Sequence, residues 1–246
     1  MPDHSLLNHT PSRSVIFLTG MRDTLPLLIA AVPFGIVYGA LAISHGLSEW
    51  LTMSMSLFVF AGASQLIAVT LLASSVAFPV ILLTVFIVNL RHMLYAATFM
   101  KQVDRLPQWL RIPMAFWLTD ETFAVVGNRV LREPEAPRFT SYYLGSCIAM
   151  YSNWVLCTWI GLTLGQQIPD MTGWGLDVAM VVAFVGIVVP LLKHRAHWAC
   201  ALTAVVAAAL TYHWPNQIGL LFSSLLAVGV GLLLETSNLE ATDHND

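Results

Sequence analysis

The sequence has few charged residues. Only 10% of its 246 residues are Asp, Glu, Lys or Arg, whereas 57% are hydrophobic. A soluble domain is about a quarter charged. So few charges cannot build a hydrated surface, and most of this surface must therefore face lipid. The composition excludes a soluble enzyme.

Cysteines and catalytic motifs are equally scarce. The three cysteines, Cys147, Cys157 and Cys200, lie in apolar segments without CxxC or Cys/His metal spacing. We expect them to be small buried apolar residues, and we expect no metal and no other cofactor. There is no GxxxxGK[ST], HExxH or GxSxG motif, so no P-loop ATPase is encoded and an enzyme is not expected. The net charge of −3 gives no reason to expect a nucleic-acid partner.

Long apolar segments take the place of these features. A membrane-spanning helix needs about 20 apolar residues. The candidate spans are Thr24–Ser44, Leu51–Ala73, Phe78–Met100, Ile112–Val130, Ser141–Gly165, Leu176–Leu192, Trp198–His213 and Gln217–Leu234. We predict an all-α polytopic membrane protein with seven or eight transmembrane helices. One transmembrane domain covers residues 24–234, between a polar N-terminal segment, 1–23, and a polar acidic tail, 235–246. We expect no cleaved signal peptide, and insertion through the first spanning helix.

The number of spans and the orientation stay open at the level of sequence. With eight spans and the N-terminus inside, Lys101, Arg105 and Arg111 fall on the wrong side of the positive-inside rule. If Ile112–Val130 does not cross, there are seven spans and the preferred side of the N-terminus reverses.

A spacing of glycines and aromatic residues occurs twice, which suggests an internal repeat. The first copy is Gly35, Gly39, Trp50, Phe60 and Gly62, and the second is Gly161, Gly165, Trp174, Phe184 and Gly186. Transporters are often built from duplicated units. An odd number of spans between the copies would invert the second one, which favours seven spans. Chance similarity among common membrane residues is the alternative.

The second candidate span contains the run Gly62-Ala63-Ser64-Gln65 in its middle. The glycine loosens the helix, and the polar side chains can satisfy backbone groups that a break sets free. We predict an interruption here that exposes N–H groups to a carboxylate. The alternative is close helix packing by small residues, which we favour for Gly62, Ala63 and Ser64. For Gln65 we favour a role in function, because an amide in a membrane needs a partner.

The third candidate span contains Asn89, Arg91, His92 and Tyr95. Asn89 and His92 are three residues apart and share one helix face, while Arg91 and Tyr95 are four apart and share another. Arg91 lies too deep to reach the membrane surface, so a buried partner or a water-filled cavity is expected.

The fourth candidate span supplies that partner, because Asp120 and Glu121 lie in its middle. Neighbouring carboxylates point about 100° apart on a helix. One can pair with Arg91 while the other faces a pathway and carries a proton. A static ion pair, or two carboxylates solvated near an interface, are the alternatives.

These blocks resemble a known family. The runs PFGIVYGALAISHGLS, FAGASQ, VNLRHMLYAATF and LTDETFA are similar to the AzlC/YgaZ family of large subunits of bacterial branched-chain amino acid exporters, over about residues 24–130. The resemblance implies export of amino acids such as valine across the bacterial cytoplasmic (inner) membrane. It also implies a small membrane partner of the AzlD/YgaH type.

We therefore expect a secondary transporter subunit that exports branched-chain or other small neutral amino acids, driven by an ion gradient, most simply protons. The competing hypotheses are an intramembrane enzyme that uses His92 with the two carboxylates, and a channel or structural membrane subunit. The predicted substrate-binding residues are Gly62, Ala63, Ser64, Gln65, Asn89, Arg91, His92, Tyr95, Asp120 and Glu121.

Overall fold

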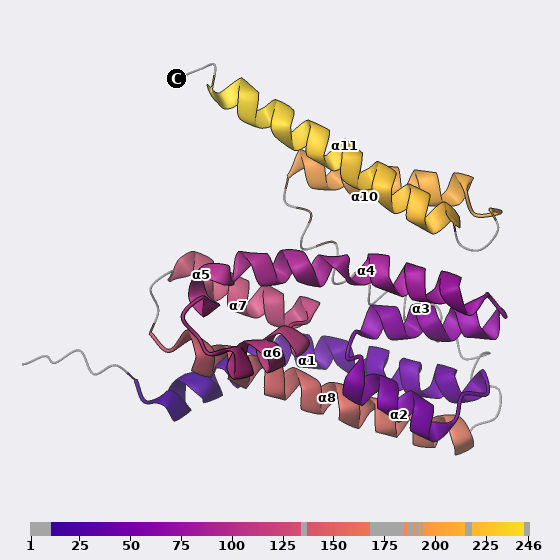
Figure 1. Ribbon diagram of the computed structural model, residues 1–246, viewed down its shortest axis with the longest axis horizontal. Helices are drawn as coiled ribbons and strands as arrows, with labels where there is room; N and C mark the ends of the chain where they lie inside the picture. Colours follow the sequence, from indigo (N-terminus) through magenta and orange to yellow (C-terminus); the bar gives the residue numbers. More distant parts are fainter. Residues whose placement is uncertain are drawn as a thin grey trace, which may run out of the picture. The chain divides into compact units, whose positions relative to one another are not determined.

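The computed structural model is all-helical over the residues that it describes (Figure 1). These are residues 11–133, 137–167, 194–214 and 218–243, together with 185, 189 and 192. The helices are α1 (Arg13–Ser44), α2 (Glu49–Phe58), α3 (Gly62–Ala73), α4 (Phe78–Thr98), α5 (Met100–Val103), α6 (Gln108–Phe116), α7 (Asp120–Arg132), α8 (Phe139–Gln167), α10 (Arg195–Leu210) and α11 (Ile218–Asp243). The predicted span Leu176–Leu192 lies almost wholly outside the described residues.

Among the described residues, three helices are long and apolar enough to cross a membrane, and they are Arg13–Ser44, Phe78–Thr98 and Phe139–Gly165. They correspond to the first, third and fifth predicted spans. The second half of the chain adds shorter apolar helices over Arg195–Leu210 and Phe222–Glu235. The chain is therefore a helical membrane protein, and the predicted total of seven or eight spans stays a prediction.

The chain forms two compact units, Met1–Thr70 with Val88–Asp177, and Leu71–Ile87 with Val178–Asp246. In the second unit, α10 and α11 pack together, and the hydroxyls of Thr211 and Ser223 lie 3.1 Å apart. The first unit contains every predicted site residue.

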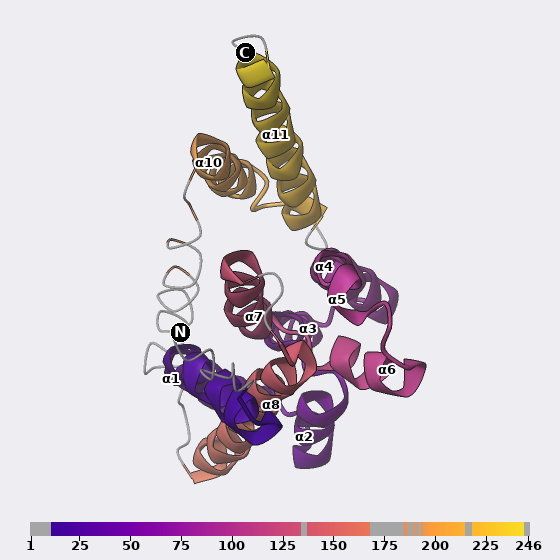
Figure 2. The same cartoon turned by 90° about the vertical axis from the view of Figure 1, so that its left-hand side faces the viewer.

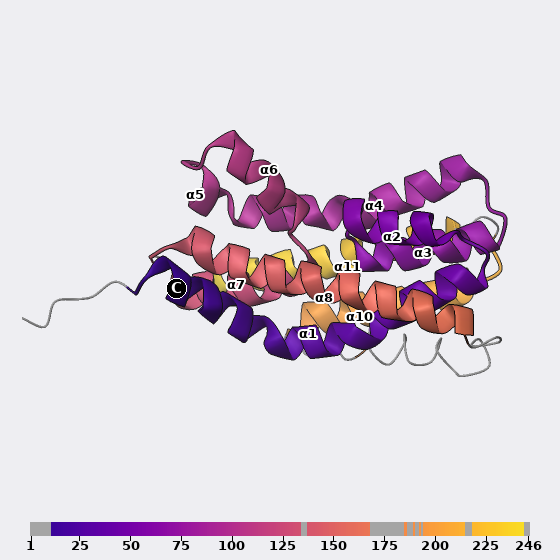
Figure 3. The same cartoon turned by 90° about the horizontal axis from the view of Figure 1, so that it is seen from below.

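The first unit is built on two long helices, α1 and α8, which lie side by side along their length (Figures 1 and 3). A Cβ at Gly39 would lie 2.3 Å from the carbonyl oxygen of Thr158, and a Cβ at Gly161 would lie 2.0 Å from that of Ile36. Glycine is therefore required on both helices, because any side chain would collide with backbone. Thr24 adds a hydrogen bond from its Oγ1 to Ser146 Oγ at 2.7 Å.

The contacts between these two helices occur in the same order along each helix. Gly20 lies against Tyr142 and Ser146, and Gly39 lies against Thr158 and Leu162. Helices α1 and α8 are therefore parallel. The first helices of the two repeat copies thus share one direction, which does not fit an inverted repeat. Trp174, Phe184 and Gly186 of the second copy lie outside the described residues.

The second predicted span, Leu51–Ala73, is not one continuous helix. Helix α2 ends at Phe58 and α3 begins at Gly62, with Phe60 between them at a φ of +45°. A left-handed conformation costs roughly 1–2 kcal/mol for a non-glycine residue. Helix α3 then runs back beside α2, so that the pair forms a hairpin over one half of α8 (Figure 3). The predicted interruption is confirmed, although it lies just before Gly62 and not within Gly62–Gln65.

The fourth predicted span, Ile112–Val130, is interrupted as well, which the sequence had not led us to expect. Helix α6 ends at Phe116, and α7 begins at Asp120 with Thr119 as its N-cap. Met114 and Trp117 contact α8 at Tyr143 and Cys147 through hydrogen bonds, and α7 then returns towards the start of α8. This second hairpin covers the other half of α8 (Figure 3). The carboxylates are therefore at a helix start, not in mid-helix.

Side chains of α8 satisfy the backbone carbonyls that the two breaks set free. The Tyr151 hydroxyl donates to the carbonyl of Leu57 at 3.0 Å, at the end of α2. The Tyr143 hydroxyl donates to the carbonyl of Met114 at 2.6 Å, near the end of α6. An unpaired carbonyl in a lipid-like interior costs several kcal/mol, so these donors stabilise both hairpin tips. Seen end-on, α8 lies between α1 and α2 and contacts both (Figure 2).

The tips of the two hairpins meet. The rings of Phe60 and Phe116 have their centroids 6.2 Å apart, and both pack on Tyr151 at 4.9 and 6.2 Å. Because the hairpins come from opposite ends of α8, two half-helices begin near the middle of the first unit. These are α3 at Gly62 and α7 at Asp120.

The two hairpins also place the basic residues at one end of the first unit. Apart from Arg91, its Lys and Arg residues lie on segments at the end where α1 and α8 begin, namely Arg13, Arg22, Lys101, Arg105, Arg111, Arg129, Arg132 and Arg138. Among the described residues of this unit, the other end has no Lys or Arg. The positive-inside rule then predicts that the N-terminal end of α1 faces the cytoplasm. If each hairpin enters and leaves the membrane on one side, the rule also predicts that Lys101, Arg105 and Arg111 lie on the cytoplasmic side.

Candidate functional site

The start of α3 is the first element of the site. Helix α3 begins directly after the break, and no acceptor is found within the described residues for the backbone N–H of Gly62, Ala63 or Ser64. A Cβ at Gly62 would lie 2.6 Å from the ring of Trp154. The glycine is therefore explained by packing against α8. The free N–H groups give this helix start a partial positive charge.

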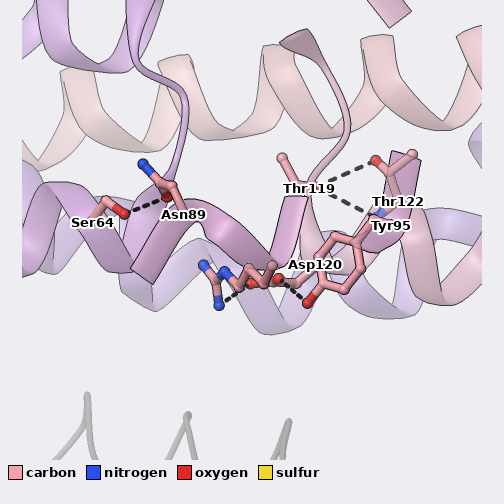
Figure 4. A network of polar contacts seen from close by, with 7 residues as sticks. Ser64, Asn89, Tyr95, Thr119, Asp120 and Thr122 are labelled. Atoms are coloured by element: carbon pink, nitrogen blue, oxygen red, sulfur yellow. Dashed lines mark hydrogen bonds and ion pairs between the residues drawn. The ribbon is translucent and has the colours of Figure 1, made fainter. Parts of the chain in front are cut away.

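Ser64 connects this helix start to α4. Its hydroxyl donates to Asn89 Oδ1 at 2.6 Å, and Ser64 is 1% exposed (Figure 4). The bond ties the first turn of α3 to the middle of α4. It therefore positions the turn of α4 that also carries Arg91.

Gln65 is fully buried and holds the break in place. Its amide donates to Ser56 Oγ on α2 at 3.0 Å, and its carbonyl accepts from the Trp154 indole N–H at 3.1 Å. Ser56 in turn lies 2.8 Å from the hydroxyl of Thr158 on α8. The amide thus points into the protein, as the sequence predicted. Its partners are Ser56 on α2, before the break, and Trp154 on α8.

Arg91 and Asp120 form an ion pair between α4 and α7. Arg91 Nη1 lies 2.9 Å from Asp120 Oδ2, with the two side chains 29% and 32% exposed. The Tyr95 hydroxyl donates to the other oxygen, Asp120 Oδ1, at 2.8 Å (Figure 4). Asp120 is the first residue of α7, so the helix dipole also stabilises its negative charge. The predicted pairing of Arg91 with one of the two carboxylates is present, and the partner is Asp120.

Aromatic rings enclose this ion pair on one side. The Tyr95 ring stacks on Phe123 with centroids 4.3 Å apart, and His92 lies edge-on to Tyr95 at 5.8 Å. Phe123 continues this cluster to Phe99, 5.4 Å away. His92 therefore borders the ion pair without binding Asp120 among the described contacts. The aromatic wall supplies an apolar surface beside the charges.

Glu121, the second residue of α7, does not share the contact with Arg91. Its half-buried side chain interacts with the hydroxyl of Thr119, the N-cap residue of the same helix. The two carboxylates therefore have different partners, as expected for neighbouring helix positions about 100° apart.

Two buried donors beside these residues have no partner within the part of the chain that the structure describes. They are Arg91 Nε and the indole N–H of Trp117. A buried donor left unpaired costs about 1–3 kcal/mol, so such groups are usually satisfied by water or a ligand. Trp117 lies in the break between α6 and α7 and is not among the site residues predicted from the sequence. Its position directly before the LTDE run was the available signal.

The groups so arranged are chemically complementary to a small molecule that carries both charges. The free N–H groups of α3, together with Arg91, suit a carboxylate. Asp120 and Glu121 suit a cation, and the rings of Tyr95 and Phe123 suit an apolar group. Among the described residues there is no group of three or more His, Cys, Asp or Glu that could hold a metal.

Comparison with known proteins gives consistent matches. The family model described as AzlC protein matches residues 26–168. A protein of Archaeoglobus fulgidus, named an uncharacterized membrane protein, is 33% identical over 223 residues, 88% of this chain and 94% of that protein. The inner membrane protein YgaZ of Escherichia coli is 30% identical over 155 residues, 62% of each chain.

A further relative has a name that describes an activity. The branched-chain amino acid transport protein AzlC of Bacillus subtilis is 25% identical over 201 residues, 80% of this chain and 77% of that protein. No solved structure matches the chain. Because the family model covers more than half of the sequence and includes both hairpins, the chain belongs to the AzlC protein family of membrane proteins.

Proposed function

We propose that this protein is the large subunit of a secondary exporter for branched-chain or other small neutral amino acids, such as valine. One observation carries the proposal: two interrupted helices start near the middle of the first unit, next to the Arg91–Asp120 ion pair. Interrupted helices whose ends point at a central binding site are a common feature of secondary transporters. The name of the Bacillus subtilis relative supports branched-chain amino acids as substrates.

The binding site follows from the charges. The α-carboxylate of the substrate meets the N–H groups of Gly62, Ala63 and Ser64 or the Arg91 guanidinium. Its ammonium group meets Asp120 or Glu121. The aliphatic side chain lies on Tyr95, with His92 at the edge of that ring, while Asn89 and Gln65 hold α4 and the hairpin in position.

The energy source is an ion gradient, most simply protons, since the sequence contains no P-loop motif. Glu121 has no ion-pair partner among the described residues, whereas Asp120 is paired with Arg91. Glu121 is therefore the better candidate for a carboxylate that takes up and releases a proton. A small membrane subunit of the AzlD/YgaH type completes the transporter.

Counterflow in proteoliposomes tests the function. The chain is reconstituted with and without the small subunit, the liposomes are loaded with unlabelled amino acid, and uptake of labelled amino acids is followed across a panel. We expect saturable valine counterflow only with both subunits. No counterflow of any amino acid with both present would overturn the function. Full counterflow by this chain alone would refute only the need for the partner.

Asp120→Asn should strongly lower valine counterflow while leaving much of the protein folded. Removing one member of a partly buried pair costs about 1–3 kcal/mol, and each 1.4 kcal/mol corresponds to about a tenfold change. We therefore expect a loss of counterflow per folded protein of about five- to a hundredfold. Asp104→Asn, in an exposed turn, is the matched control and should have wild-type activity.

The double exchange Arg91→Asp with Asp120→Arg separates structure from function. If the pair only joins two helices, the exchange restores both folding and counterflow. If the charges bind substrate, it restores the folded yield but not counterflow, which is the result we expect.

Gln65→Leu should lower counterflow more than it lowers the folded yield. The substitution leaves the Trp154 indole N–H and the Ser56 hydroxyl without Gln65, so the start of α3 loses its fixed position. Gln108→Leu, at the exposed first residue of α6, is the control. Normal counterflow per folded Gln65→Leu protein would show that the amide is not needed for the site.

A further inference from the structure

A pocket of about 850 Å³ lies between α1 and α7, at the end of the first unit where the basic residues gather. Residues Ile16 to Leu27 of α1 form one wall, residues Ala124 to Glu133 of α7 form the other, and Tyr142 of α8 closes the space between them. Small-molecule sites usually have volumes of about 300–1,000 Å³. The pocket is distinct from the residues around Arg91 and has no part in the site described above.

The lining of the pocket combines charges of both signs. It contains Arg22, Arg129 and Arg132 together with Asp23 and Glu133. A simple anion would meet two carboxylates here, and a simple cation would meet three guanidinium groups. A ligand that carries both a carboxylate and an ammonium group can satisfy both signs.

The pocket also has an apolar part, formed by side chains that include Ile16, Leu27 and Val125. An amino acid with an aliphatic side chain would bury that side chain against these residues. Mixed charges beside an apolar surface therefore match the same substrate class as the site around Arg91 and Asp120.

Several charged side chains of the pocket are held in position by contacts with other pocket residues. The Tyr142 hydroxyl donates to Asp23 Oδ2 at 2.8 Å, and the Arg129 guanidinium lies 4.1 Å from the centroid of the same ring. Arg132 Nε donates to Asn128 Oδ1 at 3.0 Å. Charged groups held in this way are positioned before a ligand arrives, which lowers the cost of binding.

Helix α7 carries residues of both the pocket and the Arg91–Asp120 ion pair. Asp120, Ala124 and Asn128 are spaced four residues apart and lie on one face of the helix. At 1.5 Å per residue, Asn128 lies about 12 Å from Asp120 along the axis. Ala124, between them, is exposed and small. On this face of α7, only the small side chain of Ala124 therefore lies between the pocket residue Asn128 and Asp120 of the ion pair.

We propose that this pocket is the cytoplasmic capture site for the amino acid, which binds there as a zwitterion before it moves along α7 to Arg91 and Asp120. The carboxylate pairs with Arg129 or Arg132, and the ammonium group pairs with Asp23 or Glu133. The proposal rests on the proposed transport function and adds a second binding site to it.

Substrate protection of a cysteine in the pocket tests the proposal. The complex with the small subunit is placed in inside-out vesicles and carries Asn128→Cys, or as a matched control Leu131→Cys, which lies on the same helix outside the pocket and is 84% exposed in the native protein. The vesicles react with a membrane-impermeant thiol reagent, with or without saturating valine. Mass spectrometry then measures labelling at residue 128 or 131, so the native cysteines need not be removed.

We expect valine to slow labelling of the Asn128→Cys variant several-fold and to leave the Leu131→Cys variant unchanged. Equal labelling with and without valine, in a preparation whose wild-type complex exchanges valine, overturns the capture site and leaves the transport function standing. Failure of the wild-type complex to exchange any amino acid overturns both.

A second measurement covers the case in which Asn128→Cys does not fold. Arg129→Gln should raise the KM for valine offered from the cytoplasmic side several-fold, with little change in maximal rate, while Arg105→Gln outside the pocket should not. An unchanged KM for Arg129→Gln contradicts the proposal.

Discussion

The structure depends on the need to satisfy backbone groups where helices are interrupted inside a membrane. Each break leaves carbonyl and N–H groups without helical partners, and lipid offers none. Helix α8 supplies the missing donors, since Tyr151 binds the end of α2, Tyr143 binds the end of α6 and Cys147 contacts the carbonyl of Trp117. The hairpins can exist because α8 lies against both. Helix α8 is itself held in place by glycine contacts with α1.

This arrangement explains why the polar residues gather near the middle of the first unit. The carbonyl ends of α2 and α6 are capped by α8, and the N–H end of α7 is capped by Thr119, whereas the first N–H groups of α3 have no acceptor among the described residues. Asp120 occupies the start of α7, where the helix dipole favours a carboxylate. The start of α3 has no acidic residue in its first turn. The two helix starts therefore differ chemically, and together they suit the two charges of an amino acid.

Much of this could be predicted from the sequence, because composition and polar residues in apolar segments are local signals. The apolar runs predicted α1, α4 and α8, and the Gly62–Gln65 run predicted a break within two or three residues. Arg91 had few possible partners, so its pairing with Asp120 or Glu121 followed from charge alone. The choice between the two carboxylates required the direction of each side chain on α7.

The hairpin geometry could not be predicted in the same way. An apolar segment of about 20 residues has the same hydropathy whether it crosses the membrane or turns back in the middle. Treating Leu51–Ala73 and Ile112–Val130 as crossings placed Lys101, Arg105 and Arg111 on the wrong side. The charged pocket was missed because its residues come from α1, α7 and α8, which are distant in sequence and meet only in the fold.

From the hairpin geometry we infer that both interrupted helices turn back without crossing the membrane. Single cysteines at Ser48 and Ser75, which flank the first hairpin, test it most directly when labelled with an impermeant reagent from one side at a time. We expect both positions to react from the extracellular side, and we expect cysteines at Gln108 and Glu133, which flank the second hairpin, both to react from the cytoplasmic side. Reaction of Ser48→Cys and Ser75→Cys from opposite sides would contradict it.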